Sequence, residues 1–297
     1  MRFGFRKKVQ VAKAVRISQE EWLERVVASL SDRSVLSPQG DPMPSFPSEE
    51  RQTNTTSISG ERALRQAHAF YSDICDVIEP RGLGLSREAS VLDFGSCWGR
   101  ITRFFMRDVS LKNLHGIDVV PEFVNECRDL FGSSNFMQCG AMPPCHHASS
   151  SMDLISAYSV FSHLSEKAFL AWMGEFHRVL RPNGILAFTT RSELFLDYCQ
   201  GLRTSGAELG SYAAALAVMI PDVDDARRRY RAGEFLFATG RGLSGGGEMN
   251  ESFYGEAFVP EGYVAERLSN LFEVLNFKSV GNGYDQALIV LKKKNHS

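Results

Sequence analysis

The sequence lacks several features that would assign a protein to a class at once. None of its apolar runs approaches the roughly 18 residues of a membrane-spanning helix, and the longest is AAALAVMI at 213–220. The N-terminus is basic but never sustains an apolar stretch, which argues against a secretory signal peptide. The formal net charge of the 297 residues is only −2, so we expect no overall attraction to nucleic acid or to an acidic surface. These absences predict a cytoplasmic protein.

Paired cysteines are also missing. The 6 cysteines form no CxxC pair, and a chain of this length without a signal peptide favours reduced thiols over a disulfide framework. The segment CGAMPPCHH (139–147) combines two cysteines with two histidines, but its spacing matches no standard zinc site. We therefore predict no metal centre.

The first sixty residues differ from the rest, and we treat 1–60 as an N-terminal extension. Residues 1–16 contain several Lys and Arg and no acid, a pattern suited either to peripheral contact with an anionic membrane or to a solvated arm. Residues 17–30 have helical apolar spacing with Ser18 as cap. Residues 37–60 are rich in Pro, Ser, Thr and Gly, which predicts a linker.

From residue 61 onward, short apolar runs alternate with helical patterns. The runs are VLDF (91–94), LHGID (114–118), NFMQC (135–139), DLISAY (153–158) and ILAFTT (185–190), and the helices fall near 100–108, 121–131 and 165–180. This alternation predicts an α/β fold with a parallel sheet and right-handed crossovers. Near the end, GNGYD joins two strand-like segments as a hairpin, so the last strand should be antiparallel to its neighbour.

The alternation of strand-like and helical segments is interrupted after the fifth apolar run, and this interruption divides the chain into three parts. We predict a core at 61–191, an insertion at 192–250 and a segment at 251–297 that completes the core. The insertion carries helical patterns followed by the glycine-rich run ATGRGLSGGGE, which is typical of a lid over the ligand end of a sheet.

The stretch VLDFGSCWGR is the strongest functional signal. It reads as a strand, a tight loop and a helix start, the arrangement that binds nucleotides at the carboxyl ends of parallel strands. Its glycines, Gly95 and Gly99, do not have the G-x-G-x-x-G spacing of a dinucleotide site, and Asp93 would oppose a pyrophosphate. A cationic cofactor such as S-adenosylmethionine suits that acid, and Asp118 at the end of the second run can accept bonds from ribose hydroxyls.

With these motifs in order, 89–190 resembles a class I S-adenosylmethionine-dependent methyltransferase. The likeness rests on VLDFGSCWGR, GIDVVPEF, CGAMPPCHHASSSMDLISAYSVFSHL and FHRVLRPNGILAFTTR, and FYGEAFVPEGYVAERLSNLFEVLNF resembles the closing part of bacterial members. It covers roughly 61–293 and implies a Rossmann-like seven-stranded methyltransferase sheet with an antiparallel last strand, helices on both faces and a helical lid insertion. It also implies S-adenosylmethionine as cofactor and S-adenosylhomocysteine as product. The motifs specify the fold and the cofactor, not the acceptor.

The resemblance assigns cofactor contacts to residues at the ends of four strands. These are Asp93, Gly95, Ser96, Cys97 and Gly99 around the methionine part, Asp118 and Val119 at the ribose, Gly140, Ala141 and Met142 at the adenine, and Tyr158 and Ser159 beside the methyl. Cys97 replaces the usual middle glycine. It fits if its φ is negative; otherwise the loop carries about 1 kcal/mol of strain.

Methyl transfer from a sulfonium needs mainly alignment of the acceptor and exclusion of water. A base is required only if the acceptor loses a proton, and His163 is the imidazole nearest in sequence to the expected methyl position. Tyr158 can position the acceptor, and we predict Arg191, Tyr254 and Glu256 as acceptor-pocket residues.

The acceptor can be narrowed by exclusion. Methyltransferases that act on the exocyclic amines of bases have a (D/N)PP(Y/F) motif after the fourth strand, and here that position reads AYSV. Cytosine C5 methylation needs a nucleophilic cysteine after the fourth strand, whereas Pro144-Cys145 precedes it. The core also lacks a basic patch interleaved with aromatics, so we expect no nucleic acid partner. A small-molecule, lipid or glycan-linked acceptor remains. A catalytically silent cofactor-binding protein and an NAD-dependent oxidoreductase stay open as alternatives.

Overall fold

A computed structural model of the chain describes residues 17–295 apart from 207, 244, 246 and 248. The basic segment at 1–16, and with it the predicted membrane contact, lies outside the described residues.

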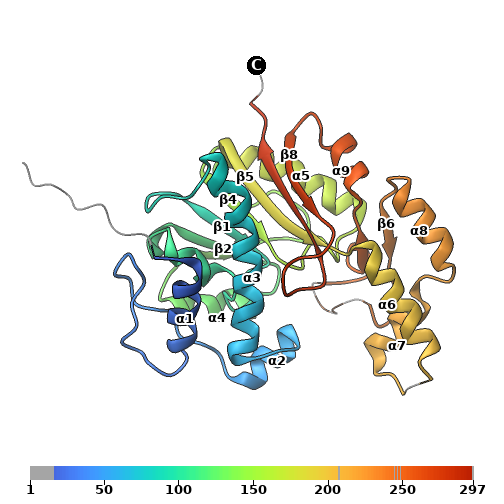
Figure 1. Cartoon of the computed structure of the whole chain (residues 1–297), viewed down its shortest axis with the longest axis horizontal. Coiled ribbons are helices and arrows are strands. Elements are labelled where there is room, and N and C mark those ends of the chain that lie inside the picture. The colour runs from blue at the N-terminus through green and yellow to red at the C-terminus, as the bar shows by residue number, and fades with distance from the viewer. Residues whose placement is uncertain (1–16, 207, 244, 246, 248, 296–297) are drawn as a thin grey trace, which may run out of the picture.

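A seven-stranded sheet forms the centre of the protein (Figure 1). Its order is β3-β2-β1-β4-β5-β9-β8, and only the pairings of β9 are antiparallel. The strands are β1 (Val91–Phe94), β2 (Leu114–Asp118), β3 (Phe136–Gln138), β4 (Met152–Ala157), β5 (Leu180–Thr190), β8 (Phe272–Lys278) and β9 (Ala287–Lys293). The predicted seven-stranded methyltransferase sheet with an antiparallel last strand is therefore confirmed.

The described part of the chain also contains helices, most of which cover the two faces of this sheet. They are α1 (Gln19–Ala28), α2 (Glu49–Thr56), α3 (Gly60–Ile78), α4 (Pro121–Phe131), α5 (Glu166–Val179), α6 (Glu193–Thr204), α7 (Ser211–Met219), α8 (Val223–Arg231), α9 (Glu261–Arg267) and the 3₁₀ segments η1 (Glu79–Arg81), η2 (Thr102–Arg107) and η3 (Leu111–Asn113). The helix predicted at 100–108 is a 3₁₀ segment instead. All six residues of η2 are buried, so the packing of its side chains outweighs the better hydrogen bonding of an α-helix.

Alternate residues of the strands face opposite sides of the sheet and build two hydrophobic cores. Val91 and Leu154 pack with α1, α3 and η2 on one face, whereas Leu92 and Ile155 pack with α5 and α9 on the other. The sheet is thus covered on both faces, as a mostly parallel sheet with buried strands requires. Its carboxyl-end loops are left to form a site.

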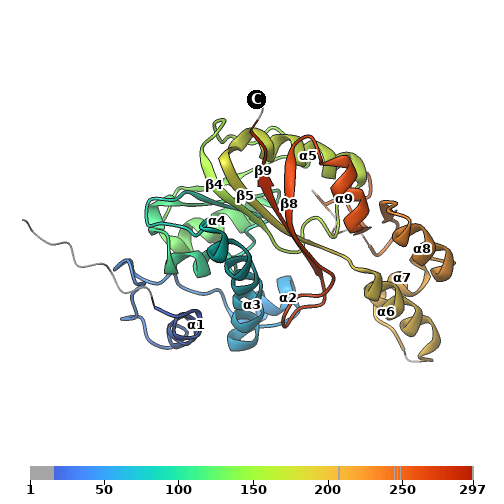
Figure 2. The same ribbon diagram turned by 45° about the horizontal axis from the view of Figure 1, so that its top comes forward.

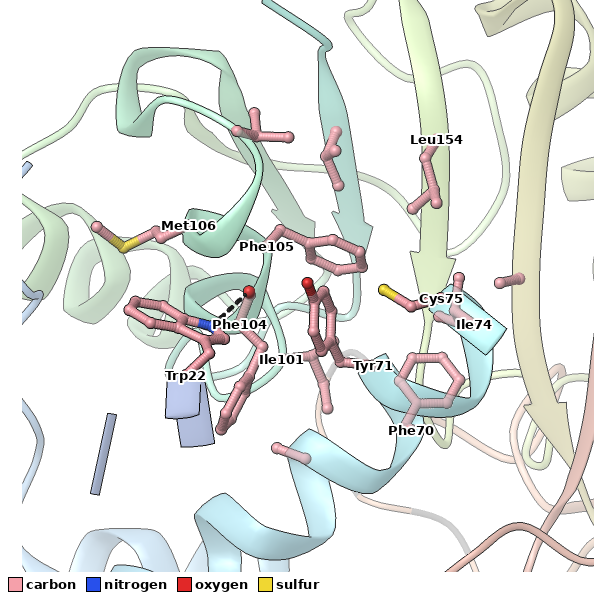
Figure 3. Packing of buried hydrophobic residues seen from close by; sticks show 14 of the residues in the cluster. Trp22, Phe70, Tyr71, Ile74, Cys75, Ile101, Phe104, Phe105, Met106 and Leu154 are labelled. Atoms are coloured by element: carbon pink, nitrogen blue, oxygen red, sulfur yellow. Dashed lines mark hydrogen bonds between the residues drawn. The ribbon is translucent and has the colours of Figure 1, made fainter. Parts of the chain in front are cut away.

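The N-terminal helix α1 belongs to the first of these cores. Trp22 is fully buried beside Tyr71 and Phe104, and its indole nitrogen donates to the Phe104 carbonyl over 2.8 Å (Figure 3). Ser18 caps the helix as predicted, accepting from the Glu21 amide.

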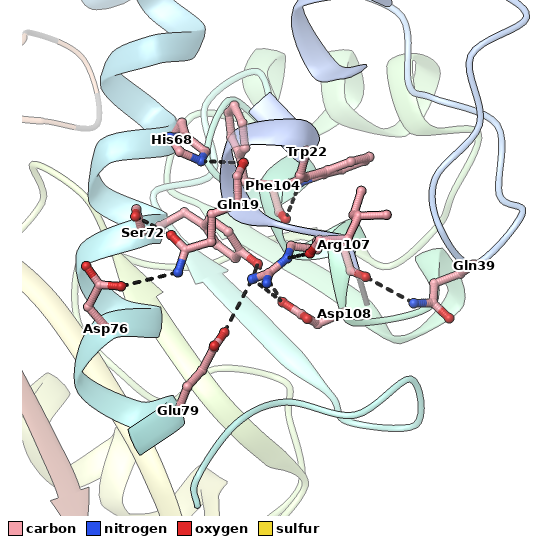
Figure 4. A network of polar contacts seen from close by, with 12 residues as sticks. Gln19, Trp22, Gln39, His68, Ser72, Asp76, Glu79, Phe104, Arg107 and Asp108 are labelled. Carbon is pink, nitrogen blue, oxygen red and sulfur yellow. Dashed lines mark hydrogen bonds and ion pairs between the residues drawn. The ribbon is translucent and has the colours of Figure 1, made fainter. Parts of the chain in front are cut away.

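A buried polar network holds the same region together. Arg107 donates to the Ile17 carbonyl and to the hydroxyl of Tyr71, and Tyr71 in turn donates to Asp108 over 2.5 Å (Figure 4). Because each of these polar groups has a partner, burying them costs little. The network ties α1 to α3 and η2.

The linker predicted at 37–60 contains a helix, so that prediction is wrong in part. Ser48 caps α2 by accepting from the Arg51 amide, and Ser57 ends the helix in a left-handed conformation. The capping signal was present in SEERQ, but the polar composition of the segment concealed it. Figures 1 and 2 place α2 beside the end of α3 and near the loop between β8 and β9.

The insertion forms its own small unit at the edge of the core (Figure 2). Helices α6, α7 and α8 share a separate hydrophobic cluster, and a two-stranded sheet pairs β6 (Leu236–Ala238) with β7 (Glu256–Phe258). This small sheet is not apparent from the sequence pattern, because each of its strands has only three residues. It connects the insertion to the segment that completes the core.

Among the helices that the structure describes, none combines the length and apolarity needed to cross a bilayer.

Replacing Trp22 with alanine should lower the free energy of unfolding by about 3–5 kcal/mol, since it empties a large buried volume and orphans the Phe104 carbonyl. Urea denaturation of the full chain measures this. Leu194→Ala, at a side chain that is 56% exposed, is the control and should change stability by no more than about 0.5 kcal/mol. An equal response of the two variants would contradict the assignment of α1 to the core.

Candidate active site

The loops at the carboxyl ends of β1, β2, β4 and β5 enclose a cavity of about 720 Å³. That volume is typical of small-molecule sites, which span about 300–1,000 Å³. The insertion and α2 contribute further walls, including Leu243 and Met249 from the first and Thr55 from the second. The cavity therefore lies where a doubly wound sheet is expected to bind its ligand.

The loop after β1 forms one wall of the cavity and depends on two glycines. Gly95 has φ +75°, and a Cβ there would lie 2.4 Å from a methyl carbon of Val160. Gly99 has φ +74°, and a Cβ there would lie 2.2 Å from the ring of Phe131. Both positions exclude a side chain, for reasons of conformation and of space. Ser96 also lines the cavity in this loop.

Cys97 stands between these glycines in the left-handed region, with φ +49°. The sequence left open whether this residue has a negative φ without strain or a positive φ with strain. The structure shows the second, which costs about 1 kcal/mol of backbone strain. Its amide donates to Asp118 over 3.0 Å, and this bond compensates for the strain. Burial raises the pKa of the Cys97 thiol to about 12, so the side chain is a protonated wall residue and not a nucleophile at neutral pH.

Asp118 ends β2 and lines the cavity next to Val119. Its two carboxylate oxygens accept the amides of Cys97 and Val120, each over 3.0 Å. Burial raises the pKa of Asp118, and these backbone donors oppose the rise. Each oxygen keeps a second lone pair, so the carboxylate can also accept bonds from a pair of ribose hydroxyls.

Asp93 lies below the loop and does not line the cavity, in contrast to the expected contact with the methionine part. Its carboxylate accepts the hydroxyls of Thr102 over 2.6 Å and Ser156 over 3.0 Å. Burial raises the pKa of Asp93 to about 6, although these two donors lower it. Its side chain therefore supports the loop from within the core and does not contact a ligand directly.

Of the three residues predicted at the adenine, only Ala141 lines the cavity. Gly140 and Met142 are exposed outside it, because the chain turns away at this point. Trp172 of α5 also lines this end and donates to the Ala141 carbonyl over 3.0 Å. The aromatic wall was not predicted, since Trp172 reads as an ordinary core residue of a helix.

Arg100 is a lining residue that the sequence did not single out. The guanidinium donates to Gln66 over 2.7 Å and lies 5.1 Å from the ring centre of Tyr158. The side chain is only 7% exposed, and the residue follows directly on the glycine loop. A buried arginine in this position can pair with the carboxylate of an amino acid.

The opposite side of the cavity, here called the acceptor half, is lined by Tyr158, His163, Arg191, Tyr212, Tyr254 and Asp285. His163 and Tyr254 stack face to face, with ring centres 4.8 Å apart and planes at 4°. Nδ1 of His163 lies 2.8 Å from the Gly255 carbonyl. A carbonyl can only accept, so Nδ1 carries the proton of that bond and Nε2 is left as the basic nitrogen.

Glu256 connects these residues from behind the wall. It is fully buried and does not line the cavity, so it is not a direct acceptor contact. Its oxygens pair with Arg191 Nε over 2.7 Å, accept the Tyr212 hydroxyl over 2.5 Å and lie 3.4 Å from Nδ1 of His163. Although burial alone would raise the pKa of Glu256, His163 and Arg191 lower it to about 2. We call these four residues the Glu256 cluster.

The Glu256 cluster draws on four separate parts of the chain. His163 follows β4, Arg191 follows β5, Tyr212 begins α7 of the insertion and Glu256 lies in β7. The sequence suggested three of these residues singly, and the structure brings them together. Tyr212 was missed, because a half-exposed tyrosine at the start of a helix carries no distinctive signal.

Comparison with known proteins identifies a family that part of this chain matches. Residues 92–188 match the model of a methyltransferase domain family. Residues 92–188 are therefore a methyltransferase domain, and the order of the seven-stranded sheet agrees with the fold expected for it. The match covers the glycine loop, the β2 end with Asp118 and the loop after β4 with Tyr158 and His163. S-adenosylmethionine is the cofactor that the sequence resemblance implies for such a domain.

Solved structures similar to this chain include a protein from Pyrococcus horikoshii, at 18% identity over 75% of this chain and 91% of that one, with a TM-score of 0.45. An S-adenosylmethionine-dependent methyltransferase from Methanosarcina mazei matches at 16% identity over 71% and 95%, with a TM-score of 0.45. Another from Mesorhizobium loti matches at 9% identity over 72% and 95%, with a TM-score of 0.46. The search of curated protein sequences found no match.

The cavity of the methyltransferase domain suits this cofactor. Gly95, Ser96 and Cys97 of the glycine loop line the cavity, whereas Gly99 packs against Phe131 and is not a lining residue. Asp118 offers acceptors for a ribose, and Trp172 with Val119 and Ala141 offers an apolar wall for an adenine. Arg100 can hold the carboxylate of the methionine part. Within the described residues no group of three or more His, Cys, Asp or Glu is placed to hold a metal ion.

Replacing Asp118 with alanine should weaken S-adenosylhomocysteine binding at least about tenfold, the loss of one to two charge-assisted hydrogen bonds. Calorimetric titration of the full chain measures the affinity. Asp118→Asn keeps one acceptor oxygen, so its affinity should fall between that of the unchanged protein and that of Asp118→Ala. Asp129→Ala, on the exposed side of α4, is the control and should leave the affinity unchanged. Unchanged affinity in Asp118→Ala would place the ribose elsewhere.

Replacing Tyr212 with phenylalanine should cost about 1.5 kcal/mol of stability, because it removes a hydroxyl bonded to a charged carboxylate. It should also speed amide hydrogen exchange in α7, because the Tyr212 hydroxyl bonds this helix to Glu256. Tyr198→Phe on α6, at a tyrosine that is 51% exposed, is the matched control. Equal exchange in the two variants would show that the bond does not hold the insertion.

Proposed function

We propose that this methyltransferase domain transfers a methyl group by in-line displacement to a small-molecule, lipid or glycan-linked acceptor that gives up a proton, with His163 as the general base. One observation carries the proposal: His163 lines the cavity with Nδ1 bonded to a carbonyl and a buried carboxylate beside it. A base is useful only if the acceptor is protonated. The arrangement favours catalysis over silent binding of the cofactor.

The roles of the chain's own residues follow from their contacts. S-adenosylmethionine supplies, when bound, a methyl group on a positively charged sulfur. The glycine loop, Asp118 and Arg100 bind the cofactor, and Tyr158 and Ser159 line the cavity where the β4 end meets the acceptor half. His163 Nε2 takes the acceptor proton, while Glu256 stabilises the imidazolium that forms. Glu256 thus acts through His163 and is a positioning residue.

Water is excluded by parts outside the seven-stranded core. Leu243, Met249 and Phe253 close the cavity near the insertion, and α2 closes it near the glycine loop. The first contribution supports the assignment of 192–250 as a lid, and the second gives α2 of the N-terminal extension a role at the cofactor site. A nucleic acid acceptor is not supported. Of the three described arginines that line the cavity, Arg51 and Arg191 are already paired with carboxylates, and Arg100 is assigned to the cofactor's carboxylate.

The function is tested by incubating the full chain with radiolabelled S-adenosylmethionine and a panel of small-molecule acceptors, with release of S-adenosylhomocysteine as readout. Turnover supports the proposal. Cofactor binding without turnover on any acceptor would favour the silent alternative, and binding of NAD instead would favour the oxidoreductase.

For an acceptor found in this way, His163→Ala should reduce kcat by about 10²–10⁴, the usual worth of a general base. Affinity for S-adenosylhomocysteine should stay within about twofold, because His163 takes no part in binding the cofactor. His146→Ala, at an exposed histidine outside the cavity, is the matched control and should leave kcat unchanged. A full rate in His163→Ala would assign the base elsewhere.

A further inference from the structure

The loop joining β8 and β9 is anchored to α3 by one buried carboxylate. Asp73 is 4% exposed and accepts four hydrogen bonds from this hairpin. The donors are Lys278 Nζ at 2.9 Å, the amide and Nδ2 of Asn282 at 3.0 and 2.8 Å, and the Tyr284 hydroxyl at 2.8 Å. Charge-assisted bonds in such number hold a loop in a single conformation.

The two residues that flank Asp285 near the end of the hairpin loop, Tyr284 and Gln286, are held as well. Tyr284 is buried, and its ring packs edge-on against Tyr158 with centres 5.7 Å apart. Gln286 accepts the Thr189 hydroxyl over 2.6 Å and donates to the Ser159 hydroxyl over 2.8 Å. The hairpin tip is therefore fixed to the ends of both β4 and β5.

Between them, Asp285 is exposed and lines the cavity. Among the described residues, two carboxylates line this cavity, Asp118 and Asp285. Asp118 already accepts two backbone amides. For Asp285 the described part of the chain offers neither a hydrogen bond nor an ion pair, although its charge acts on Arg191 and on Tyr158. A rigidly mounted carboxylate with free acceptor sites in a ligand cavity is suited to bind a donor on the ligand.

The charges around Asp285 determine whether the ligand donor that it binds is neutral or cationic. In the acceptor half, the charge of Arg191 is balanced by Glu256, and His163 acts as an uncharged base in the proposed mechanism. Arg100 directly follows the glycine loop, and the function proposed above assigns it to the cofactor's carboxylate. Among the side chains of the acceptor half, Asp285 therefore leaves one net negative charge, which disfavours an acidic acceptor and favours a cation.

From this placement, and resting on the function proposed above, we infer that the acceptor is a small amine, cationic in solution, which Asp285 draws into the cavity and holds for N-methylation. The rings of Tyr158, Tyr212 and Tyr254 line the same half and can face a cationic nitrogen. The amine would be delivered by its charge and oriented by these rings.

The charge movement of the reaction suits the same carboxylate. The ammonium gives one proton to His163 Nε2, and the nitrogen lone pair then forms the N–C bond to the methyl group. The S–C bond breaks, and its electron pair stays on sulfur. Positive charge thus moves from sulfur to nitrogen, toward Asp285, which stabilises it in the transition state. A hydroxyl acceptor that has lost its proton would gain nothing from this carboxylate.

The test uses two probes of the same skeleton, benzylammonium and benzyl alcohol, titrated calorimetrically into the full chain saturated with S-adenosylhomocysteine. Benzylammonium should bind at least about tenfold more tightly than benzyl alcohol, because its ammonium group makes a charge-assisted hydrogen bond with Asp285. Asp285→Asn should remove that preference while leaving S-adenosylhomocysteine affinity unchanged. Asp129→Asn, an exposed acid outside the cavity, should keep the preference.

Equal binding of the two probes, tighter binding of the alcohol or binding of neither would overturn the inference. An equal loss of S-adenosylhomocysteine affinity in Asp285→Asn would also overturn it, because Asp285 would then serve the cofactor. Turnover of the acceptor panel separates this result from the function: methylation of alcohols alone would reject the amine and leave the methyltransferase assignment intact. Methylation of amines that is weakened in Asp285→Asn and not in Asp129→Asn would support both.

Discussion

A fully buried carboxylate organises the acceptor side of this protein. Burying the charge of Glu256 would cost several kcal/mol if it had no partners, so its environment must supply donors with good geometry. Those donors, Arg191, Tyr212 and His163, come from the end of β5, the insertion and the loop after β4. The requirement to satisfy Glu256 therefore keeps three separate segments together and fixes the orientation of the imidazole.

The cofactor side depends on the sheet instead. The glycine loop is tied to β2 because the Gly95 and Ser96 amides both donate to the Ile117 carbonyl, over 2.8 and 3.2 Å. Asp118 adds a third bond to the amide of Cys97. These contacts explain how a cysteine persists at a positive φ, where a glycine would fit with less strain: the neighbouring strand supplies bonds that compensate for it.

The two sides differ in origin, and this difference has a functional consequence. The cofactor half is built by strand ends that the parallel sheet aligns, so its position follows from the fold. The acceptor half adds to the ends of β4 and β5 the insertion, the segment before β7 and the tip of the hairpin, and these outer parts are held by particular pairs such as Asp73 with Tyr284. Changes in these outer parts can alter the acceptor without disturbing the cofactor site, which is how one fold serves many substrates.

The sequence by itself determined the order of the strands along the chain, the antiparallel end of the sheet, the glycine loop and the acid of β2, because each depends on local pattern and spacing. It also suggested His163, Arg191 and Glu256, but only as separate candidates. Tertiary structure alone decided that α2 and Asp285 reach the cavity, that Asp93 does not, and that Tyr212 bonds Glu256. The physical reason is range: those contacts join residues far apart in the chain through single hydrogen bonds and ion pairs, which leave no periodic signal in the sequence.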